Sequence, residues 1–380
     1  MGVVFIAFLV IGLAIPVLPL HVSKSLGLGA FAVGLVSGAQ FTASLLSRFW
    51  AGNFADSHGG KKAVITGLLI AVTAGLIYFL SLRFLDDPKK SVIILLLGRA
   101  VLGGAESFII TGALSWGLVT GGAKNAGKVM AWLGTALYLA FAVGAPAGTA
   151  MYSSYGFISV AFVTCVIPLL TLLFVMPRHF TAIPAPSRPS FTTMIGAVSG
   201  PGFGLALSSL GFGAISTFII LYFTEHGWPS GWLALTVYAT SFIAARMLFG
   251  HLADRIGGAR VAFASTLIEA TGLIIIWMAP LPGFAFAGAI ITGFGYSLVY
   301  PGFGVEALRR IPSQNQGLAM GAYTAFLDVA LGIANPVLGF IGHKAGLHSV
   351  FLVSALVVIC SAFVAAGMLR KEKKAGMAII

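Results

Sequence analysis

Long apolar runs dominate the chain, and they predict its secondary structure. A run of roughly 20 apolar residues is the length that a helix needs to cross about 30 Å of hydrocarbon. Strands of a barrel would instead alternate apolar and polar residues over about ten positions. We therefore predict an all-α membrane protein with twelve transmembrane helices, over residues 3–23, 30–52, 62–82, 91–116, 128–151, 157–176, 199–224, 230–251, 260–280, 283–305, 317–341 and 348–369.

The composition excludes a soluble domain. Of the 380 residues, 58% are hydrophobic and only 8% are charged, and the mean hydropathy is +1.02. A soluble domain carries about 25% charged residues. The chain therefore has too few charges to cover a surface that faces water.

The positions of the cations predict the orientation. Fourteen lysines and arginines fall in loops on one side of the expected membrane or in the tail, and five fall on the other side, where Asp86 and Asp87 offset two of them. Under the positive-inside rule both termini are cytoplasmic. Nothing basic precedes the first run, so we do not expect a cleaved signal peptide. The cations are dispersed over several loops, which argues against a nucleic-acid partner. We expect a multi-pass membrane protein, and the family resemblance given below implies the inner membrane of a bacterium.

One charged segment occurs twice. "RFWAGNFADSHGGKK" begins at Arg48, and "RMLFGHLADRIGGAR" begins 198 residues later at Arg246. A second pair of similar segments, "NAGKVMAWLGTALYLAFAVGAP" and "NQGLAMGAYTAFLDVALGIANP", is separated by 190 residues. The period is six helices, which predicts two pseudo-symmetric six-helix bundles at 1–176 and 199–369. A Pro- and Ser-containing cytoplasmic linker at 177–198 joins them, and a basic cytoplasmic tail covers 370–380.

The repeated segment resembles the loop 2–3 signature of the major facilitator superfamily, G-x-x-x-D-(R/K)-x-G-R-(R/K). The first copy carries it at Gly52, Asp56, Gly59, Lys61 and Lys62, and the second at Gly250, Asp254, Arg255, Gly257 and Arg260. The resemblance implies a transporter that works by alternating access. It also implies that the two loops clamp the halves together on the cytoplasmic side, through an Asp that meets cations and a helix N-terminus. Topology and a tight turn are the alternative explanation. Ser57 replaces the usual basic residue, which implies a weaker first clamp.

Four ionisable residues within the spans are candidates for function: Arg99, Glu106, Glu269 and Asp328. Each costs about 2.5–3.5 kcal/mol at the bilayer centre on insertion scales, so such residues are functional candidates by default. Arg99 and Glu106 are two helical turns apart, which puts them on one face about 10 Å from each other. Arg99 with Gly103 also resembles the superfamily's R-x-x-x-G signature, whose Arg is linked to proton transfer.

We expect Asp328 to be a proton or substrate site, because a desolvated carboxylate favours its protonated form. Its repeat counterpart is Tyr138, and we expect the two to face each other across a central cavity. For Glu269 we favour a structural partner over a cavity role. The remaining cavity candidates are polar or aromatic: Gln40, Ser208, Ser209, Tyr296 and Tyr300.

The stretch "GAPAG", with Gly144, Pro146 and Gly148, resembles a loosened form of the superfamily's antiporter signature. Close packing of small residues explains it equally well. The chain as a whole resembles bacterial drug:proton antiporters and the arabinose-efflux-permease-like branch. We therefore predict a proton-coupled exporter of a small amphiphilic molecule, drug or sugar-like metabolite. Two acids against one Arg favour a cationic or neutral substrate.

Three alternatives remain: a proton-coupled importer of a sugar or organic acid, a non-transporting membrane sensor, and an intramembrane enzyme. The chain contains no H-E-x-x-H, G-x-S-x-G or clustered His/Cys motif, which argues against the intramembrane enzyme. We expect no cofactor and no metal, a small-molecule substrate and protons as partners, and a monomer in the bilayer. Cys165 and Cys360 lie in apolar spans and are interpreted as small buried hydrophobes.

Overall fold

The computed structural model describes residues 2–121, 126–177, 191–309, 311–312 and 316–377. All secondary structure within these residues is helical: α1 (Gly2–Leu20), the π-helix η1 (His21–Ser25), α2 (Ala30–His58), α3 (Gly60–Leu82), α4 (Pro88–Gly121), α5 (Ala126–Tyr155), α6 (Phe157–Val175), α7 (Phe191–Glu225), α8 (Gly231–Phe249), α9 (Leu252–Ile256), α10 (Gly258–Trp277), α11 (Pro282–Leu308), α12 (Gln316–Ala345) and α13 (Leu347–Met377). Twelve helices of the described chain are long and apolar enough to cross a membrane, which confirms the predicted fold class.

Several helices extend beyond the apolar runs that predicted them. α7 begins at Phe191, eight residues before the expected start, and α13 continues to Met377. Hydropathy marks only the part of a helix that lies in hydrocarbon, whereas the backbone hydrogen bonds continue past it. The short helix α9 follows the end of α8 and precedes the turn at Gly257.

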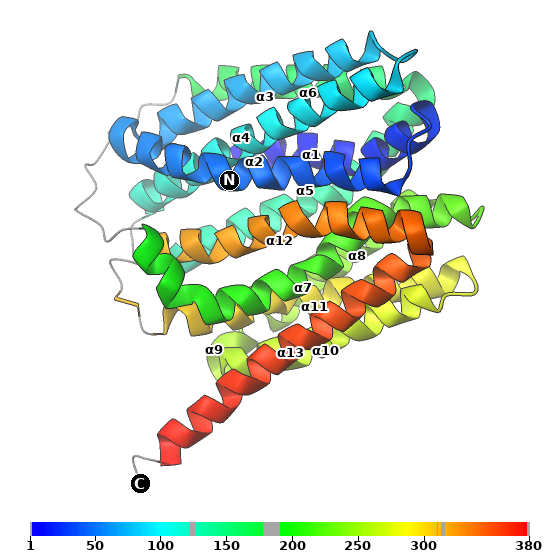
Figure 1. The fold of residues 1–380 in the computed structure, drawn as a ribbon. Helices are drawn as coiled ribbons and strands as arrows, with labels where there is room; N and C mark the ends of the chain where they lie inside the picture. Colours follow the sequence, from blue (N-terminus) through cyan, green and yellow to red (C-terminus); the bar gives the residue numbers. More distant parts are fainter. Residues whose placement is uncertain (1, 122–125, 178–190, 310, 313–315, 378–380) are drawn as a thin grey trace.

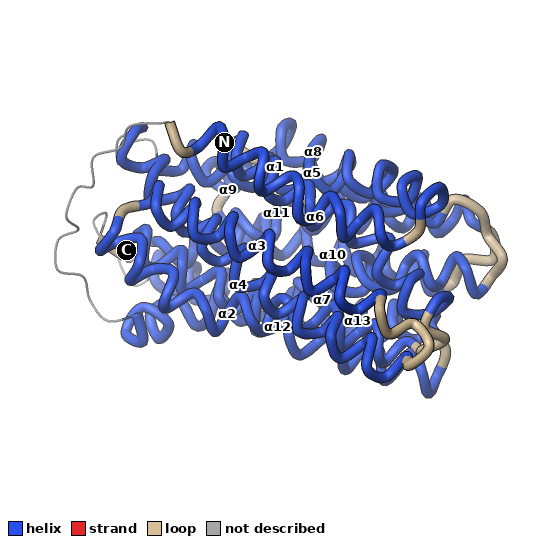
Figure 2. Tube along the Cα trace, turned by 90° about the horizontal axis from the view of Figure 1, so that it is seen from above, coloured by secondary structure: helices blue, strands red, loops and turns tan. Residues whose placement is uncertain are grey.

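The helices run side by side in two groups (Figures 1 and 2). Within the first group α1 packs on α5, α2 on α4 and α3 on both α4 and α6. Within the second, α7 packs on α12 and α13, α10 on α11 and α13, and α11 on α8. The main contacts between the groups are α2 with α12 and α5 with α8. Any group that moves relative to the other must therefore slide or rock along these two helix pairs.

Glycines with positive φ mark equivalent turns in the two halves. They occur in three pairs, at positions 27 and 227, 59 and 257, and 156 and 346. Gly59 has φ 89° and ψ 151°, and Gly257 has φ 98° and ψ 138°. This conformation is almost restricted to glycine, because a Cβ would clash with the backbone. The glycine of the repeated segment is thus explained by the turn that it makes.

α2 and α12 approach most closely on the side away from the turns at Gly59 and Gly257. A Cβ added to Gly34 would meet the carbonyl oxygen of Asn335, and one added to Gly339 would lie 2.6 Å from the carbonyl oxygen of Ala30. A Cβ on Gly38 would lie 2.8 Å from the ring of Pro336. We call this contact, made by residues 30–42 and 332–343, the glycine seam. In Figure 1, α2 and α12 lie nearest each other where this seam runs.

Outside the membrane spans, one carboxylate caps a helix. Asp87 Oδ1 accepts a hydrogen bond from the backbone N–H of Lys90 at 3.2 Å, and Asp87 Oδ2 lies 2.9 Å from Lys90 Nζ. These interactions with Lys90 lower the pKa of Asp87. The contact orders the start of α4 and offsets one of the five cations on this side.

Candidate functional site

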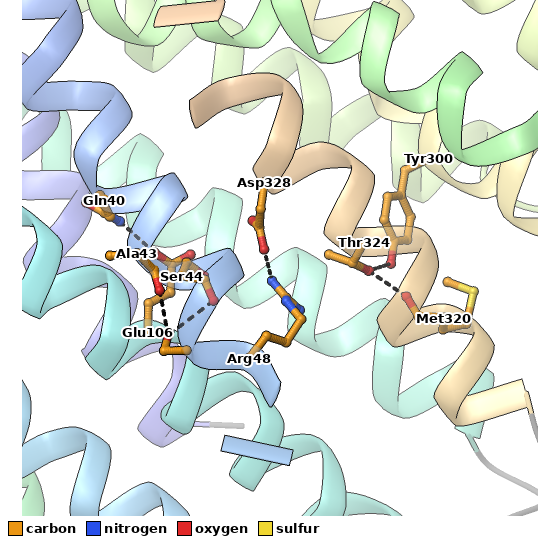
Figure 3. Close-up of polar contacts among 10 residues, drawn as sticks. Gln40, Ala43, Ser44, Arg48, Glu106, Tyr300, Met320, Thr324 and Asp328 are labelled. Atoms are coloured by element: carbon orange, nitrogen blue, oxygen red, sulfur yellow. Dashed lines mark hydrogen bonds and ion pairs between the residues drawn. The ribbon is translucent and has the colours of Figure 1, made fainter. Parts of the chain in front are cut away.

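An ion pair joins the two halves in the middle of the α2–α12 contact. Arg48 Nη2 of α2 pairs with Asp328 Oδ2 of α12, and the two side chains are only 12% and 4% exposed (Figure 3). Next to it, Gln40 Nε2 donates to Glu106 Oε2 of α4 at 2.6 Å. We call Gln40, Arg48, Glu106 and Asp328 the acidic cluster. It places two carboxylates and one arginine at the boundary between the halves.

The three charged residues predicted to couple protons or bind substrate are electrostatically connected. Asp328, Arg48 and Arg99 all act on the carboxyl group of Glu106. Arg99 is buried, and its Nε and Nη1 atoms have no hydrogen-bond partner. It acts on the hydroxyl of Tyr78 of α3, a residue that is fully buried. Arg99 therefore lies deeper in the N-terminal half than Arg48 and forms no ion pair with Glu106.

A second cluster occupies the equivalent place in the other half. The offset of 198 relates Gln40 to Tyr238 as it relates Arg48 to Arg246, and the offset of 190 relates Glu106 to Tyr296 as it relates Tyr138 to Asp328. The backbone confirms the first pairing: a Cβ on Gly103 would meet the carbonyl oxygen of Gln40, and one on Gly293 would meet that of Tyr238.

We call Tyr138, Tyr238, Arg246 and Tyr296 the tyrosine cluster. The arginine is kept, and each polar or acidic partner is replaced by a tyrosine. Arg246 lies over the ring of Phe242, with 5.4 Å from the guanidinium carbon to the ring centroid. The tyrosines whose hydroxyls lie within electrostatic range of it are Tyr138, Tyr296, Tyr300 and Tyr323. Within the described chain no carboxylate pairs with Arg246.

Aromatic rings fill the space between the halves beside this cluster. Tyr138 of α5 stacks on Phe242 of α8 with a centroid distance of 3.4 Å. Phe212 of α7 stacks on Phe141 at 6.1 Å and on Tyr296 at 5.8 Å. The rings come from four helices of both halves, so they form an apolar contact between the halves rather than the core of a single bundle.

Asp328 and Tyr138, which were expected to face each other across a cavity, contact different helices of the opposite half. Asp328 points to Arg48 on α2, whereas Tyr138 stacks on Phe242 on α8. The reason is the pseudo-symmetry itself. It relates the α2–α12 contact to the α8–α5 contact, so counterpart residues lie at two different contacts between the halves and each meets an arginine-bearing helix.

The other cavity candidates divide between the interior of the second half and its boundary. Ser208 donates to Glu269, and both are fully buried. Ser209 donates to the carbonyl oxygen of Leu205 at 2.8 Å and lies 3.2 Å from the hydroxyl of Tyr296. Tyr300 lies nearer the boundary: its hydroxyl is 3.0 Å from Thr324 Oγ1, and Arg246, Arg48 and Asp328 all act on it.

The repeated loops differ in how they engage their neighbours. In the second copy Asp254, Arg255 and Arg260 are exposed, and Glu306 Oε1 of α11 accepts the N–H of Ala259 at 3.2 Å. Glu306, rather than Asp254, therefore meets the N-terminus of α10. In the first copy Lys61 Nζ donates to the carbonyl oxygen of Met176 at 2.7 Å, while Asp56 and Lys62 are exposed. Gly52 has no heavy atom within 4 Å of an added Cβ. Gly250 caps α8.

The stretch that resembled an antiporter signature packs within one half. Added Cβ atoms on Gly144 and Gly148 would meet the backbone of α1 at Gly12 and Leu13, and Pro146 lies between them in α5. This close α1–α5 contact accounts for both glycines. It carries no information on the direction of transport.

Two site residues escaped the sequence analysis. Arg48 and Arg246 were interpreted only as the start of the repeated segment, although both lie inside expected spans. Of the 22 lysines and arginines, nineteen were assigned to loops or tail, and Arg48, Arg99 and Arg246 are the remaining three. The cost of a charge in hydrocarbon applies to all three alike and was the signal that identifies them. Asn335 was also missed; it is fully buried and neither side-chain polar atom has a partner.

The cysteines and the cavities indicate no other chemistry. Cys165 is buried as expected, whereas Cys360 is exposed on α13, so the expectation for Cys360 is wrong. An apolar thiol is equally stable against lipid, which is why hydropathy did not separate the two cases. The described residues contain no group of three His, Cys, Asp or Glu suited to a metal. A cavity of about 10 Å³ beside Glu106 lies within the N-terminal half and has room for one water.

The fold and the buried charges between two helical halves define a membrane transporter, and comparison with known proteins gives its family. The Major Facilitator Superfamily model matches residues 1–239 and 202–378. An uncharacterized MFS-type transporter of Salmonella typhimurium is 39% identical over 371 residues, which cover 97% of this chain and 95% of that protein. An uncharacterized MFS-type transporter of Pseudomonas aeruginosa is 39% identical over 376 residues, 98% of this chain and 92% of that protein. The chain belongs to the major facilitator superfamily, a family of transporters and not of enzymes.

Solved structures share the fold at low identity. The human organic anion transporter MFSD10 superposes with a TM-score of 0.71 at 14% identity, covering 96% of this chain and 98% of that one. The fucose:proton symporter of E. coli gives 0.66 at 16% identity, covering 96% and 97%. Such identities show the architecture alone. The protein is therefore a multi-pass membrane transporter of the superfamily, with bacterial relatives.

Proposed function

We propose that this protein is a proton-coupled secondary transporter in which Asp328 carries the proton. Arg48, in the opposite half, is attracted to Asp328 when Asp328 is ionised and less so when it is protonated. The observation that carries the proposal is the buried Arg48–Asp328 pair between α2 and α12. An ionised Asp328 holds the two helices together at this point. A protonated Asp328 keeps a hydrogen bond at most and releases most of that attraction.

The position of the pair relative to the glycine seam supports alternating access. Gly38 and Arg48 are ten residues apart on α2, which corresponds to about 15 Å along the helix. The seam closes one side of the α2–α12 contact, and the ion pair lies between the seam and the repeated turns. With the orientation predicted from the cations, the seam is the extracytoplasmic closure. Rocking of the halves would open it and expose the pair to the other side.

Glu106 is the second proton site in this proposal. Asp328 acts on it electrostatically, so ionisation of one carboxyl group opposes ionisation of the other. Gln40 donates to Glu106 and holds it in place beside the pair. Coupled titration of this kind separates the protonation of the two carboxyl groups into two steps, so the cluster can exchange one proton while it keeps the other.

Two modes of coupling follow from the substrate's charge. The sequence favoured export by exchange, in which a cationic or neutral substrate competes with protons for the acidic cluster. The second candidate is co-transport of a proton with an organic acid. One observation favours it: Arg246 is a cation in the membrane-spanning helix α8, and no carboxylate of the described chain pairs with it. With Arg48 and Arg246 added to Arg99, the arginines outnumber the two acids of the cluster.

Proton movement in proteoliposomes tests the proposal. A panel of amphiphilic acids, amines and neutral compounds is added, and internal pH is recorded with a trapped dye. We expect a substrate-dependent proton flux in the wild type that is lost in Asp328→Asn and reduced in Glu106→Gln. Asp328→Glu should retain it, and Asp86→Asn, at an exposed loop position, is the matched control. A substrate that still moves its proton in Asp328→Asn would contradict the assignment.

A further inference from the structure

We infer that Arg246 and the surrounding tyrosines form the binding site for the carboxylate group of a small organic anion, which defines the substrate class. This inference rests on the proposed function, because it assigns the cargo of the same transporter. The observation behind it is that the repeat produces two related sites, the acidic cluster and the tyrosine cluster. The acidic cluster contains its own carboxylate for its arginine, and the tyrosine cluster does not.

The first step concerns the charge balance of the tyrosine cluster. A guanidinium within a membrane span is costly unless it is compensated. Arg48 is compensated by Asp328. At Arg246 the corresponding position of α5 is Tyr138, and the ring of Phe242 supplies only a cation–π contact. The buried carboxylate of this half other than Asp328 is Glu269, and Ser208 donates to it. Arg246 thus retains a positive charge that an anionic ligand can neutralise.

The second step concerns the hydrogen-bond donors around that charge. The phenols near Arg246 come from α5, α11 and α12. Tyr323 donates to the carbonyl oxygen of Tyr300, and the hydroxyls of Tyr296 and Tyr300 lie 3.2 and 3.0 Å from those of Ser209 and Thr324, so these three must leave their present partners to donate to an oxyanion. A planar guanidinium binds a carboxylate in a bidentate manner, which gives both strength and orientation. The hydroxyl of Tyr238 is buried without a hydrogen-bond partner. Phenol donors beside a guanidinium favour an anion and disfavour an ammonium group.

The third step concerns the rest of the ligand. Phe141, Phe212 and Phe242 line the boundary beside Arg246 with stacked rings and no further charge. These flat surfaces fit an apolar or aromatic body. The substrate class is therefore a monocarboxylate with an apolar body of modest size, held at one end by Arg246.

The fourth step links the anion to the proton. Tyr300 lies within electrostatic range of Arg246, Arg48 and Asp328, so the two arginine sites are close enough to influence one another. A bound anion adds negative charge near Asp328 and Glu106, which favours their protonated forms. By thermodynamic linkage protonation must strengthen anion binding equally. The proton, taken from the aqueous side to which the site is open, and the anion are then carried together.

Ligand-induced thermal stabilisation of the purified full-length protein in detergent tests the inference. The probes are acetate, lactate, benzoate and phenylacetate, each compared with its own amide, and benzylammonium as a cation of the same body. We expect at least one carboxylate to stabilise the wild type, more strongly at pH 5.5 than at pH 7.5, and its amide to have no effect. Arg246→Gln should weaken the binding of that carboxylate at least tenfold, and Arg246→Lys should restore part of the binding. Arg83→Gln, at an exposed loop position, should bind as the wild type does.

The outcomes separate this inference from the proposed function. It is overturned if no carboxylate of the panel stabilises the wild type, if Arg246→Gln binds the carboxylate unchanged, or if benzylammonium binds best. Carboxylate binding that depends on Arg246 but not on pH, in both the wild type and Asp328→Asn, would support the anion site and contradict proton coupling through Asp328. A proton flux that persists in Asp328→Asn, with anion binding intact, would do the same.

Discussion

At the scale of single residues, the feature that decides the chemistry is how each membrane-embedded arginine is compensated. Arg48 has a carboxylate from the opposite half, Arg246 has an aromatic ring and phenols, and Arg99 lies beside Tyr78 inside the first half. The three arginines share a residue type and differ in partner. In the proposed function this difference matters, because the neutral Arg48–Asp328 pair is loosened when Asp328 takes up a proton.

The Arg48–Asp328 pair should show strong coupling in a double-mutant cycle. Asp328→Asn leaves Arg48 buried and unpaired, and removal of one partner of a buried pair costs about 3–5 kcal/mol. Arg48→Gln has the mirror effect. The double variant removes both charges and should be more stable than either single variant, as measured by thermal unfolding in detergent. Additive effects of the two substitutions would show that the side chains are not paired.

At the scale of elements, glycine determines how closely two helices of opposite halves can approach. α2 and α12 meet along a seam where Gly34, Gly38 and Gly339 leave room for the partner backbone. Without a hydrophobic driving force between helices in lipid, such close packing supplies the attraction. Along the seam the two helices are therefore held by close packing, and the ion pair that also joins them, Arg48–Asp328, lies outside it.

Gly34→Val should prevent closure of the glycine seam. Its side chain would meet the carbonyl oxygen of Asn335, and overpacking of this kind costs about 1–3 kcal/mol. The equilibrium should move toward the state in which the seam is open. Accessibility of a cysteine introduced near the seam to a membrane-impermeant thiol reagent reports the shift. Gly196→Val is the control, because nothing lies within 4 Å of a Cβ added at this position of α7. In this variant the introduced cysteine should react with the reagent to the same extent as it does without the substitution.

The turn glycines of the two repeated segments should respond alike. Gly59→Ala and Gly257→Ala each force an alanine into a backbone region that is almost restricted to glycine, at a cost of about 1–3 kcal/mol. The thermal unfolding temperature should fall by similar amounts in both variants. Gly52→Ala lies within α2 with free space around it and should leave stability unchanged or raise it slightly. Unequal losses at the two turns would show that the repeat is not equivalent in structure.

At the scale of the whole molecule, two groups of helices meet mainly at two helix pairs, and the proposed alternating access requires them to move as units. Gly29 and His343 belong to opposite halves, and an added Cβ on Gly29 would lie 3.2 Å from His343 Nδ1. Ser25 Oγ and Tyr152 OH, 3.0 Å apart, both belong to the first half. The two contacts lie on the same side of the molecule, so they form a matched pair of positions for cross-linking.

A cross-link between Gly29→Cys and His343→Cys should stop transport, because it fixes the halves to each other across the seam. The background lacks Cys165 and Cys360, replaced by alanine. Uptake or efflux in proteoliposomes is measured after addition of a short bifunctional thiol reagent. The pair Ser25→Cys and Tyr152→Cys, linked in the same way, should leave transport intact. Equal inhibition by both cross-links would argue against rigid-body movement of the halves.

Sequence alone determined the membrane class, the number of helices and the duplication. Each depends on local quantities: the length of apolar runs, the conformation of a turn glycine, or the similarity of two segments. For the same reason it predicted Asp328, Glu106 and Arg99 as candidates, since a charge in an apolar run is visible without a partner. It also predicted Gln40 as a contact, although not that Gln40 donates to Glu106.

Only the tertiary structure decided which partner each buried charge has. The pairing of Arg48 with Asp328 joins residues 280 positions apart, and the placement of Arg246 among tyrosines joins four helices. The contact of α2 with α12 and of α5 with α8 separates the counterparts Asp328 and Tyr138, which the repeat pattern had placed opposite each other. Partner choice is set by how the halves pack against each other, and that packing is a property of all the helices together.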